Sequence, residues 1–224
     1  VQASPLAPAA GGTRYVSAVT GDDTNNDCTT SSNPCRTIQH AVDQANEGDE
    51  IYIATFDVRL GGGFPPSMIT DTATYTSTGE NIIFITKSLT LKGGYIYNHA
   101  GPVPSWLPGL VPAEVNGEDE RRPLYISGDI SVTAELLAFV HGKAPLGGNV
   151  YVERADVLFK ATPIRYGAAV VQSSYAEGNG GGLYLKDCHV SFDPGNVDWG
   201  TFLDRAGLLP IQHNQAEWFG GGIY

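Results

Sequence analysis

The stretch Gly147-Gly148-Asn149-Val150-Tyr151-Val152 recurs along the chain, and this recurrence decides the fold. Gly180-Gly181-Gly182-Leu183-Tyr184-Leu185 follows 33 residues later, and Gly220-Gly221-Gly222-Ile223-Tyr224 follows 40 residues after that. Glycine lets the backbone bend sharply and lie close to a neighbouring turn of chain, so a glycine block at a fixed point indicates stacked coils. The unequal spacing predicts loops of different length at one corner. The alternative is chance recurrence in a chain with 28 glycines.

Short apolar segments separated by Gly, Asn, Asp and Pro extend this pattern over most of the chain. The clearest are 82–85, 89–91, 124–126, 130–132, 150–152, 157–159, 183–185 and 190–192. Segments of this length suit the coils of a solenoid better than a sandwich with long hairpins, and no Asn-Gly or Asp-Gly turn joins two of them closely. The sequence therefore predicts an all-β solenoid.

One amphipathic helix is predicted ahead of the coils, over residues 37–46. Its apolar residues Ile38, Ala41, Val42 and Ala45 recur at spacings of three and four, which places them on one face. A strand pattern follows at 50–54. We expect the four apolar side chains to seal the first coil, because the end of a solenoid otherwise exposes strand edges and an apolar core.

Two of the three cysteines are predicted to form a disulfide. Cys28 and Cys35 lie seven residues apart in a polar loop, which ordinary disulfide geometry can close. The alternative is two free thiols, which an oxidising compartment would not preserve. Cys188 shares strand parity with Val190 and Phe192 and is predicted to point inward as a small core residue, whereas His189 should face outward.

The chain divides into three predicted parts. Residues 1–13, rich in small residues and prolines, are typical of the start left after signal-peptide cleavage or of a flexible linker, and they favour a secreted protein. Residues 14–49 form the N-terminal cap, and residues 50–224 form coils with loop insertions at about 96–123 and 193–213. In the first insertion, Trp106 and Leu107 either pack on the solenoid or form a contact surface.

Charge and hydropathy exclude some partners. The chain has 13 basic and 24 acidic residues and a formal net charge of −11, which would repel phosphate backbones and anionic lipid head groups. No apolar run approaches the ~20 residues that a membrane-spanning helix needs. We therefore expect neither nucleic-acid binding nor membrane insertion.

Four segments resemble pectin-lyase-like β-helix proteins of bacterial cell surfaces, including the polymorphic outer-membrane type. Residues 33–42 with 48–53 are similar to the capping helix and first coil, and 85–95 to the second coil. Residues 179–184, and 214–216 with 220–224, resemble the repeats in which asparagine precedes a triple glycine. The resemblance implies a right-handed parallel β-helix with an N-terminal capping α-helix. The chain departs from the repeat at Gly147-Gly148-Asn149, where a triple glycine would stand.

Catalytic residues are not assigned. A lyase would need clustered carboxylates for Ca²⁺ and a base, and a glycosidase would need a carboxylate pair. The run Glu118-Asp119-Glu120-Arg121-Arg122 is predicted to be a solvated loop. Three aspartates fall in one long excursion, at Asp193, Asp198 and Asp204, where the sequence does not fix their geometry.

A calcium site is a minor alternative. Asp23, Asn25 and Asp27 copy the first half of a calcium-loop spacing, but Cys28 and Pro34 stand where glycine and glutamate belong. Turn formation by Asp and Asn is the ordinary explanation. The histidines show no zinc spacing, so we expect no bound cofactor.

The sequence leaves three functions open. The leading one is a non-catalytic extracellular scaffold, such as an adhesin-like stalk, a surface-layer component or a filament subunit, whose partners are further coils of a longer parent or other copies of itself. The others are a lyase or glycoside hydrolase acting on acidic polysaccharide, and a carbohydrate-binding module that uses some of the 11 tyrosines and 3 tryptophans. Fold alone does not choose among them.

Overall fold

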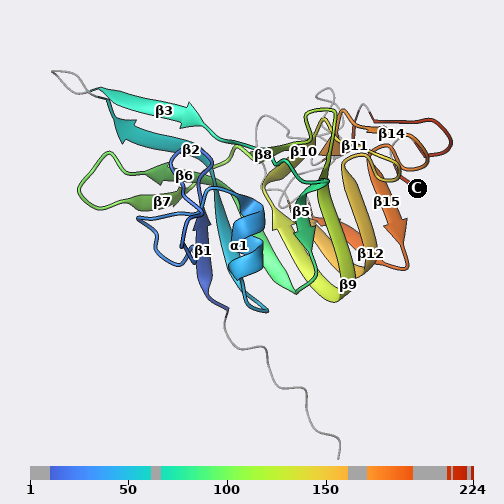
Figure 1. Ribbon diagram of the computed structural model, residues 1–224, viewed down its shortest axis with the longest axis horizontal. Coiled ribbons are helices and arrows are strands. Elements are labelled where there is room, and N and C mark those ends of the chain that lie inside the picture. Colours follow the sequence, from blue (N-terminus) through green and yellow to red (C-terminus); the bar gives the residue numbers. More distant parts are fainter. Residues whose placement is uncertain (1–10, 62–66, 161–170, 194–210, 213, 221–222) are drawn as a thin grey trace, which may run out of the picture.

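The computed structural model describes residues 11–61, 67–160, 171–193, 211–212, 214–220 and 223–224 (Figure 1). Within these residues the chain is all-β apart from one short helix, and its strands form three sheets that pair mostly in parallel. No sheet closes on itself in the described part of the chain. The arrangement is compatible with a β-helix.

The largest sheet has ten strands. They are β1 (Thr13–Val16), β2 (Glu50–Leu60), β3 (Met68–Thr72), β5 (Asn81–Ile85), β6 (Leu89–Asn98), β7 (Ser105–Pro108), β9 (Arg122–Glu135), β12 (Val150–Lys160), β15 (Leu183–Lys186) and β16 (His189–Asp193). A five-stranded sheet contains β4 (Thr74–Tyr75), β8 (Ala113–Asn116), β10 (Leu137–Val140), β13 (Val171–Gln172) and β17 (Ile211–Gln212). The third sheet contains β11 (Lys143–Ala144), β14 (Tyr175–Ala176) and β18 (Gln215–Ala216).

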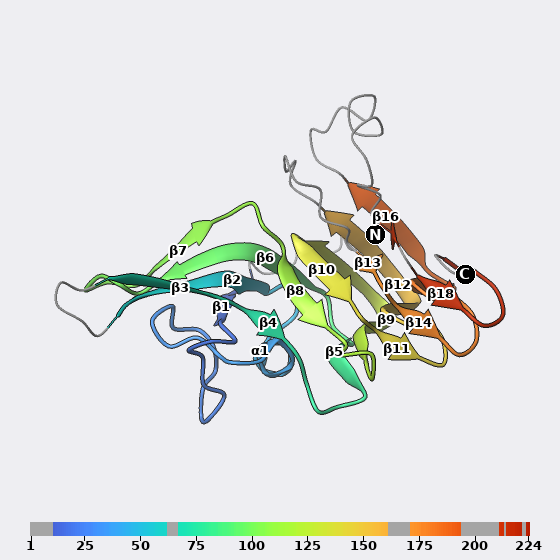
Figure 2. The same ribbon diagram turned by 90° about the horizontal axis from the view of Figure 1, so that it is seen from above.

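Successive passes of the chain visit the three sheets in the same order. From β9 the chain runs through β10 and β11 to β12, and from β12 through β13 and β14 to β15 (Figure 2). Val150 therefore pairs in parallel with Leu124 of the preceding pass and Leu183 of the next, and Leu183 forms a parallel bridge to Ile223. From β9 onward, each pass contributes to the largest, the five-stranded and the three-stranded sheet in turn, as stacked coils require.

Corners of the coils are built by residues with left-handed backbone. At one corner of the largest sheet these are Gly128 (φ 123°), Arg154 (φ 53°) and Asp187 (φ 49°), one in each pass. His141 (φ 51°) and Ser173 (φ 51°) occupy a second corner, between the five-stranded and three-stranded sheets. The segments 124–126 and 130–132, predicted as separate strands, are consequently two arms of the bent strand β9.

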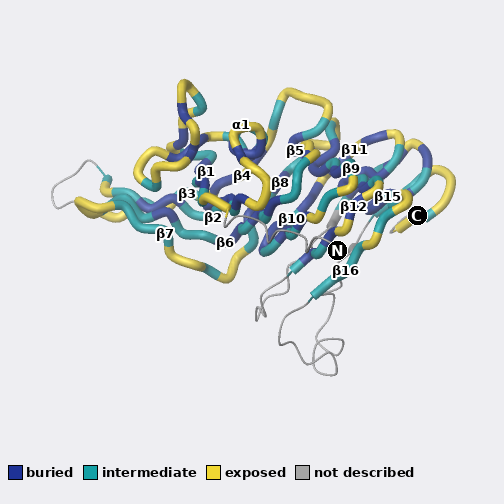
Figure 3. Tube along the Cα trace, turned by 90° about the horizontal axis from the view of Figure 1, so that it is seen from below, coloured by how far each residue is buried: buried dark blue, intermediate teal, exposed yellow. Residues whose placement is uncertain are grey.

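The helix α1 (Ile38–Gln44) is shorter than the predicted 37–46. Thr37 caps its start by accepting a hydrogen bond from the backbone N–H of His40, and Ala45 already has extended backbone. Ile38, Ala41, Val42 and Ala45 are all buried in the same apolar cluster as the inner faces of the strands. Figure 3 shows the buried positions following the strands and the exposed positions following the connecting loops.

Two hairpins extend the early strands. β3 pairs antiparallel with the end of β2, and β7 pairs antiparallel with the end of β6. We call the residues 55–60, 68–72, 95–98 and 105–108 the wing, which projects to the left in Figure 1. Its β3 hairpin has no counterpart in the sequence prediction.

The segment predicted as an insertion, 96–123, is only partly a loop outside the sheets. It contains the hairpin strand β7, but also β8, which pairs with β10 as a regular member of the five-stranded sheet, and the start of β9. The prolines suggested a loop, yet Pro108 lies on an edge strand, where proline is tolerated. Most of the second insertion, 193–213, and residues 1–10 of the predicted N-terminal segment lie outside the described residues. Thr13 begins β1.

No helix in the described part of the chain is both long enough and apolar enough to cross a membrane.

Candidate functional site

The predicted disulfide is present. Cys28 and Cys35 are bonded, their Cα atoms lie 5.1 Å apart, and both residues are fully buried. His40 lies close to the two sulfur atoms, but its Nε2 is 2.7 Å from the Asn26 carbonyl oxygen. Sulfurs bonded to each other provide no thiolate for a metal ion, so this group of residues is structural in the oxidised protein.

The calcium candidate residues are engaged with the chain itself. Asp23 accepts hydrogen bonds from the backbone N–H groups of Arg36 and Thr37 and from the Thr37 hydroxyl, which fixes the start of α1. Asp27 accepts from the backbone and hydroxyl of Thr29, and these bonds lower the pKa of its carboxyl. Asn25 has left-handed backbone with φ 51°. These contacts are those of turn and cap residues.

The glycine blocks stack on one another. Gly147, Gly180 and Gly220 all have left-handed backbone, with φ of 61°, 68° and 66°. The N–H groups of Gly147 and Gly148 donate to the carbonyl oxygens of Asn179 and Gly180, and that of Gly181 donates to Gly220. Gly182 accepts from the N–H of Val150. Gly221 and Gly222 lie outside the described residues.

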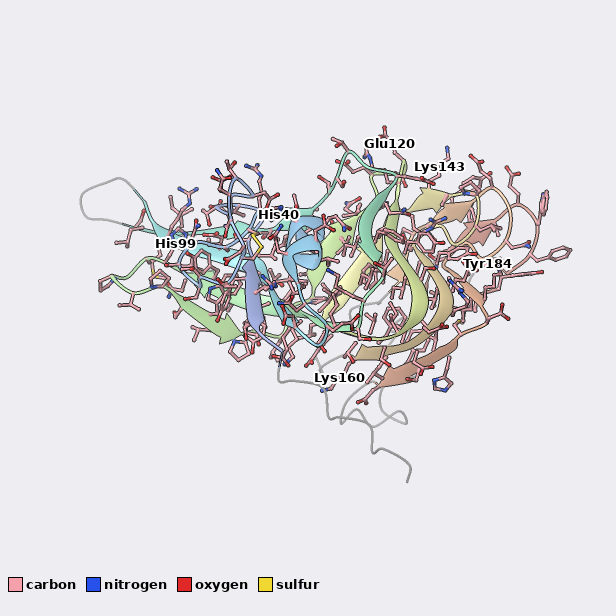
Figure 4. The ribbon with its side chains drawn as sticks, turned by 60° about the horizontal axis from the view of Figure 1, so that its bottom comes forward. His40, His99, Glu120, Lys143, Lys160 and Tyr184 are labelled. Atoms are coloured by element: carbon pink, nitrogen blue, oxygen red, sulfur yellow. A yellow bond between two sulfur atoms is a disulfide. The ribbon has the colours of Figure 1, made fainter. Side chains whose placement is uncertain are left out.

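Beside the glycine corner, a ladder of aromatic rings follows the outer face of the sheet. It consists of Phe84, Tyr125, Tyr151, Tyr184 and Tyr224, whose adjacent ring centroids lie 4.9–5.3 Å apart. Figure 4 shows Tyr184 at the end of the molecule where the last passes lie. Tyr184 stacks face to face with both Tyr151 and Tyr224, so neighbouring rings cover both of its faces, and this stacking stabilises the coils.

Arg122 corrects one sequence prediction. It was expected in a solvated loop with Glu118, Asp119, Glu120 and Arg121, but it is 8% exposed. Its guanidinium donates to the carbonyl oxygens of Gly147 and Leu146 and to Asn81. It also lies 5.4 Å and 5.3 Å from the ring centroids of Tyr125 and Tyr151.

The rest of that charged run does lie at the surface. Arg121 forms ion pairs with Glu118 and Glu120, both exposed, and Asp119 is exposed as well.

A polar groove follows the corner made by Gly128, Arg154 and Asp187. We call it the bend groove; it has a volume of about 520 Å³ and is lined mainly by Asp129, Ser131, Arg154, Asp156, Asp187, Cys188 and His189. Asp156 pairs with Ser131 on one side and His189 on the other, so the groove crosses three passes of the chain. The sequence prediction missed it, because its residues are brought together only by the stacking.

Cys188 is half-buried and packs against the core, as its strand parity indicated, while also lining the bend groove. Burial, with smaller contributions from Asp187 and Asp156, raises the pKa of its thiol, which disfavours the reactive thiolate. His189 is exposed. Asp193 ends β16, while Asp198 and Asp204 lie outside the described residues.

Trp106 and Leu107 differ in their exposure to solvent. Trp106 is half-buried, stacks on Tyr97 with ring centroids 4.7 Å apart, and packs against Tyr15. Leu107 is exposed. The tryptophan is therefore a packing residue that joins the wing to β1.

Comparison of this chain with protein-family models, with curated proteins and with solved structures finds no match.

Proposed function

We propose that the chain is a right-handed parallel β-helix of the pectin-lyase-like kind and serves as a non-catalytic extracellular scaffold at a bacterial cell surface. The observation that carries the proposal is the stacking of successive passes, in which Val150 pairs with both Leu124 and Leu183 and the aromatic ladder follows the same register. Stacked coils give a long, stiff element suited to a stalk, a surface layer or a filament.

Two further points support this proposal. Connections between parallel strands of one sheet are right-handed in about 98% of cases, which favours a right-handed coil. The Cys28–Cys35 disulfide fits an oxidising compartment outside the cytosol. The partner that we propose is another coil, in a longer parent or in a second copy, because an open parallel sheet offers N–H and C=O groups to a further strand.

An activity screen tests the scaffold role. The purified protein is incubated with polygalacturonate and alginate, with and without calcium, and unsaturated products and reducing ends are measured. We expect no turnover above a buffer control. Sustained product formation would contradict the proposal.

The bend groove supports a second candidate, an enzyme acting on acidic polysaccharide. It holds one arginine, one histidine and three aspartates, and Arg154, Asp156 and His189 are all exposed. An arginine would bind a uronate carboxylate, and an aspartate or histidine would move a proton. Under this candidate, product formation is abolished by Asp156→Asn and by Arg154→Ala, while Glu153→Gln next to the groove retains it.

A further inference from the structure

A second cavity lies on the outer face of the ten-stranded sheet, where β6, β9 and the end of β7 meet. Its volume is about 340 Å³, and its walls include Tyr95, Lys92 and Glu135 together with the apolar Pro108 and Leu110. This combination of a mainly apolar wall with a few polar groups is typical of small-molecule sites, which span ~300–1,000 Å³. We call it the Tyr95 pocket.

The aromatic wall of the Tyr95 pocket is held in place by other rings. Tyr95 stacks on Tyr52 with ring centroids 4.3 Å apart and an interplanar angle of 12°. Tyr52 contacts Tyr15 edge-on, and Trp106 lies 6.2 Å from Tyr95. A ring fixed before binding loses little conformational freedom when a ligand packs against it.

The rim of the pocket is also fixed by the backbone. Gly109 donates its N–H to the Gly94 carbonyl oxygen at 2.7 Å, and a Cβ added at Gly109 would lie 2.6 Å from that same oxygen. The end of β7 therefore lies directly against β6. Pro108 and Leu110, on either side of Gly109, are exposed apolar residues at the pocket edge.

The charges at the pocket balance. The Lys92 ammonium is 2.7 Å from a Glu50 carboxylate oxygen, and the Lys160 ammonium is 3.8 Å from Glu135. With two positive and two negative groups, the site attracts ions of neither sign. It still offers charged donors and acceptors, which form the stronger class of hydrogen bond with hydroxyl groups.

We propose that the Tyr95 pocket binds a unit of a neutral saccharide. A sugar ring has an apolar face that can pack on Tyr95, Pro108 and Leu110, and its hydroxyl groups can donate to Glu135 and accept from Lys92. A uronate would face two carboxylates with no unpaired cation to offset them. This inference does not depend on the scaffold role, because it concerns one surface of the folded chain.

Calorimetric titration of the intact protein tests the proposal. The probes are cello- and manno-oligosaccharides and N-acetylated chitin oligosaccharides, all neutral, with oligogalacturonates as the charged comparison. We expect at least one neutral oligosaccharide to bind with little dependence on salt, and oligogalacturonates to bind more weakly. Loss of a hydrogen bond to a charged group predicts that Glu135→Gln weakens binding by about tenfold or more, and that Tyr95→Ala abolishes it.

The matched control is Glu153→Gln, which removes a carboxylate paired with Lys186 on the same sheet but outside the pocket, and which should bind like the wild type. Melting curves of each variant separate lost binding from lost folding, and Glu135→Gln keeps the shape of the side chain if Tyr95→Ala does not fold. The proposal is overturned if no neutral probe binds, if oligogalacturonates bind better, or if folded Glu135→Gln binds like the wild type. None of these results requires polysaccharide turnover, so they are distinguishable from failure of the scaffold proposal.

Discussion

The indole Nε1 of Trp106 donates a hydrogen bond to the carbonyl oxygen of Ser31 at 2.9 Å, which joins the wing to the loop closed by the disulfide. The hydroxyl of Tyr97 reaches the neighbouring Ser32 carbonyl oxygen at 3.4 Å. These contacts connect segments that are distant in sequence. The disulfide therefore orders more than its own loop, because it holds the two carbonyl groups on which the aromatic residues of the wing depend.

Removing the disulfide should destabilise the protein. In the loop-entropy model, closing a loop of this size contributes about 2–3 kcal/mol. We expect the double variant Cys28→Ala/Cys35→Ala to lose about that much free energy of unfolding in denaturant titrations, with a shift in tryptophan fluorescence. Cys188→Ala, which breaks no covalent bond, is the control. Equal midpoints for the double variant and the wild type would show that the bond is dispensable.

Val42 tests the capping role of α1. It is 2% exposed and packs in the core cluster, so Val42→Asp would bury a carboxylate with no partner. The expected cost is about 3–5 kcal/mol or outright aggregation. Gln44→Asp places the same carboxylate on the exposed side of the helix and should change the melting temperature little. If both variants melt like the wild type, α1 does not seal the core.

Substitution of two adjacent arginines, Arg121 and Arg122, should destabilise the protein to very different extents. Arg122→Met leaves the buried Gly147 carbonyl group and the partly buried Leu146 carbonyl group without this donor, which we expect to cost about 2–4 kcal/mol. Arg121→Met breaks only ion pairs with exposed glutamates, which are worth about 0–1 kcal/mol. Denaturant unfolding of both variants measures the difference. Similar losses for the two would contradict the structural role of Arg122.

Gly180 is predicted to tolerate no side chain. Its φ is 68°, and an added Cβ would lie 2.3 Å from the Leu183 carbonyl oxygen. We expect Gly180→Ala to destabilise the protein by more than about 1–2 kcal/mol, the cost of left-handed backbone alone. Gly101→Ala is the control, because nothing lies within 4 Å of its Cβ position. Differential scanning calorimetry should show a lower melting temperature for Gly180→Ala only.

Asp49 should make stability depend on pH in acid. Burial opposes ionisation of Asp49, but hydrogen bonds from the N–H groups of Asn46 and Gly12 and from Arg14 outweigh it and hold its pKa below the ordinary 3.8. A lowered pKa stabilises the fold above the ordinary value, and this stability is lost as the pH falls through the lower folded value. Asp49→Asn should therefore be less stable near neutral pH, with a shallower loss of stability in acid. An unchanged slope would exclude Asp49 as a contributor.

Sequence patterns predicted the parts of this fold that depend on local composition. The glycine blocks marked one corner of the coil, because Gly147, Gly180 and Gly220 adopt backbone conformations that glycine allows most readily. The apolar spacing of Ile38, Ala41 and Val42 predicted the buried face of α1. The seven-residue cysteine spacing predicted the disulfide.

The remaining features depend on contacts between distant residues. Arg154 builds a corner with left-handed backbone, which an arginine side chain rarely indicates, and Asp187, a residue type found more often in that conformation, takes the same place in the next pass. The strands β2 and β3 of the wing are separated by the seven residues 61–67 rather than by a two-residue turn, so the sequence lacks the short-hairpin signal there. The bend groove and the Tyr95 pocket combine residues from different passes, so their composition is visible only once the register of the sheet is known.

The outward side chains at the corner of Gly128, Arg154 and Asp187 follow one another at a regular pitch along the coil axis. Connections of different length join β12 to β13 and β16 to β17. The paired residues of neighbouring passes nevertheless stay in register on both sides of this corner. The spacing of the outward side chains along the coil axis is therefore set by the backbone hydrogen bonds between neighbouring strands, at about 4.8 Å per pass. Substitutions at Asp129, Arg154 or Asp187 would change the order of charges along the groove while leaving their period unchanged.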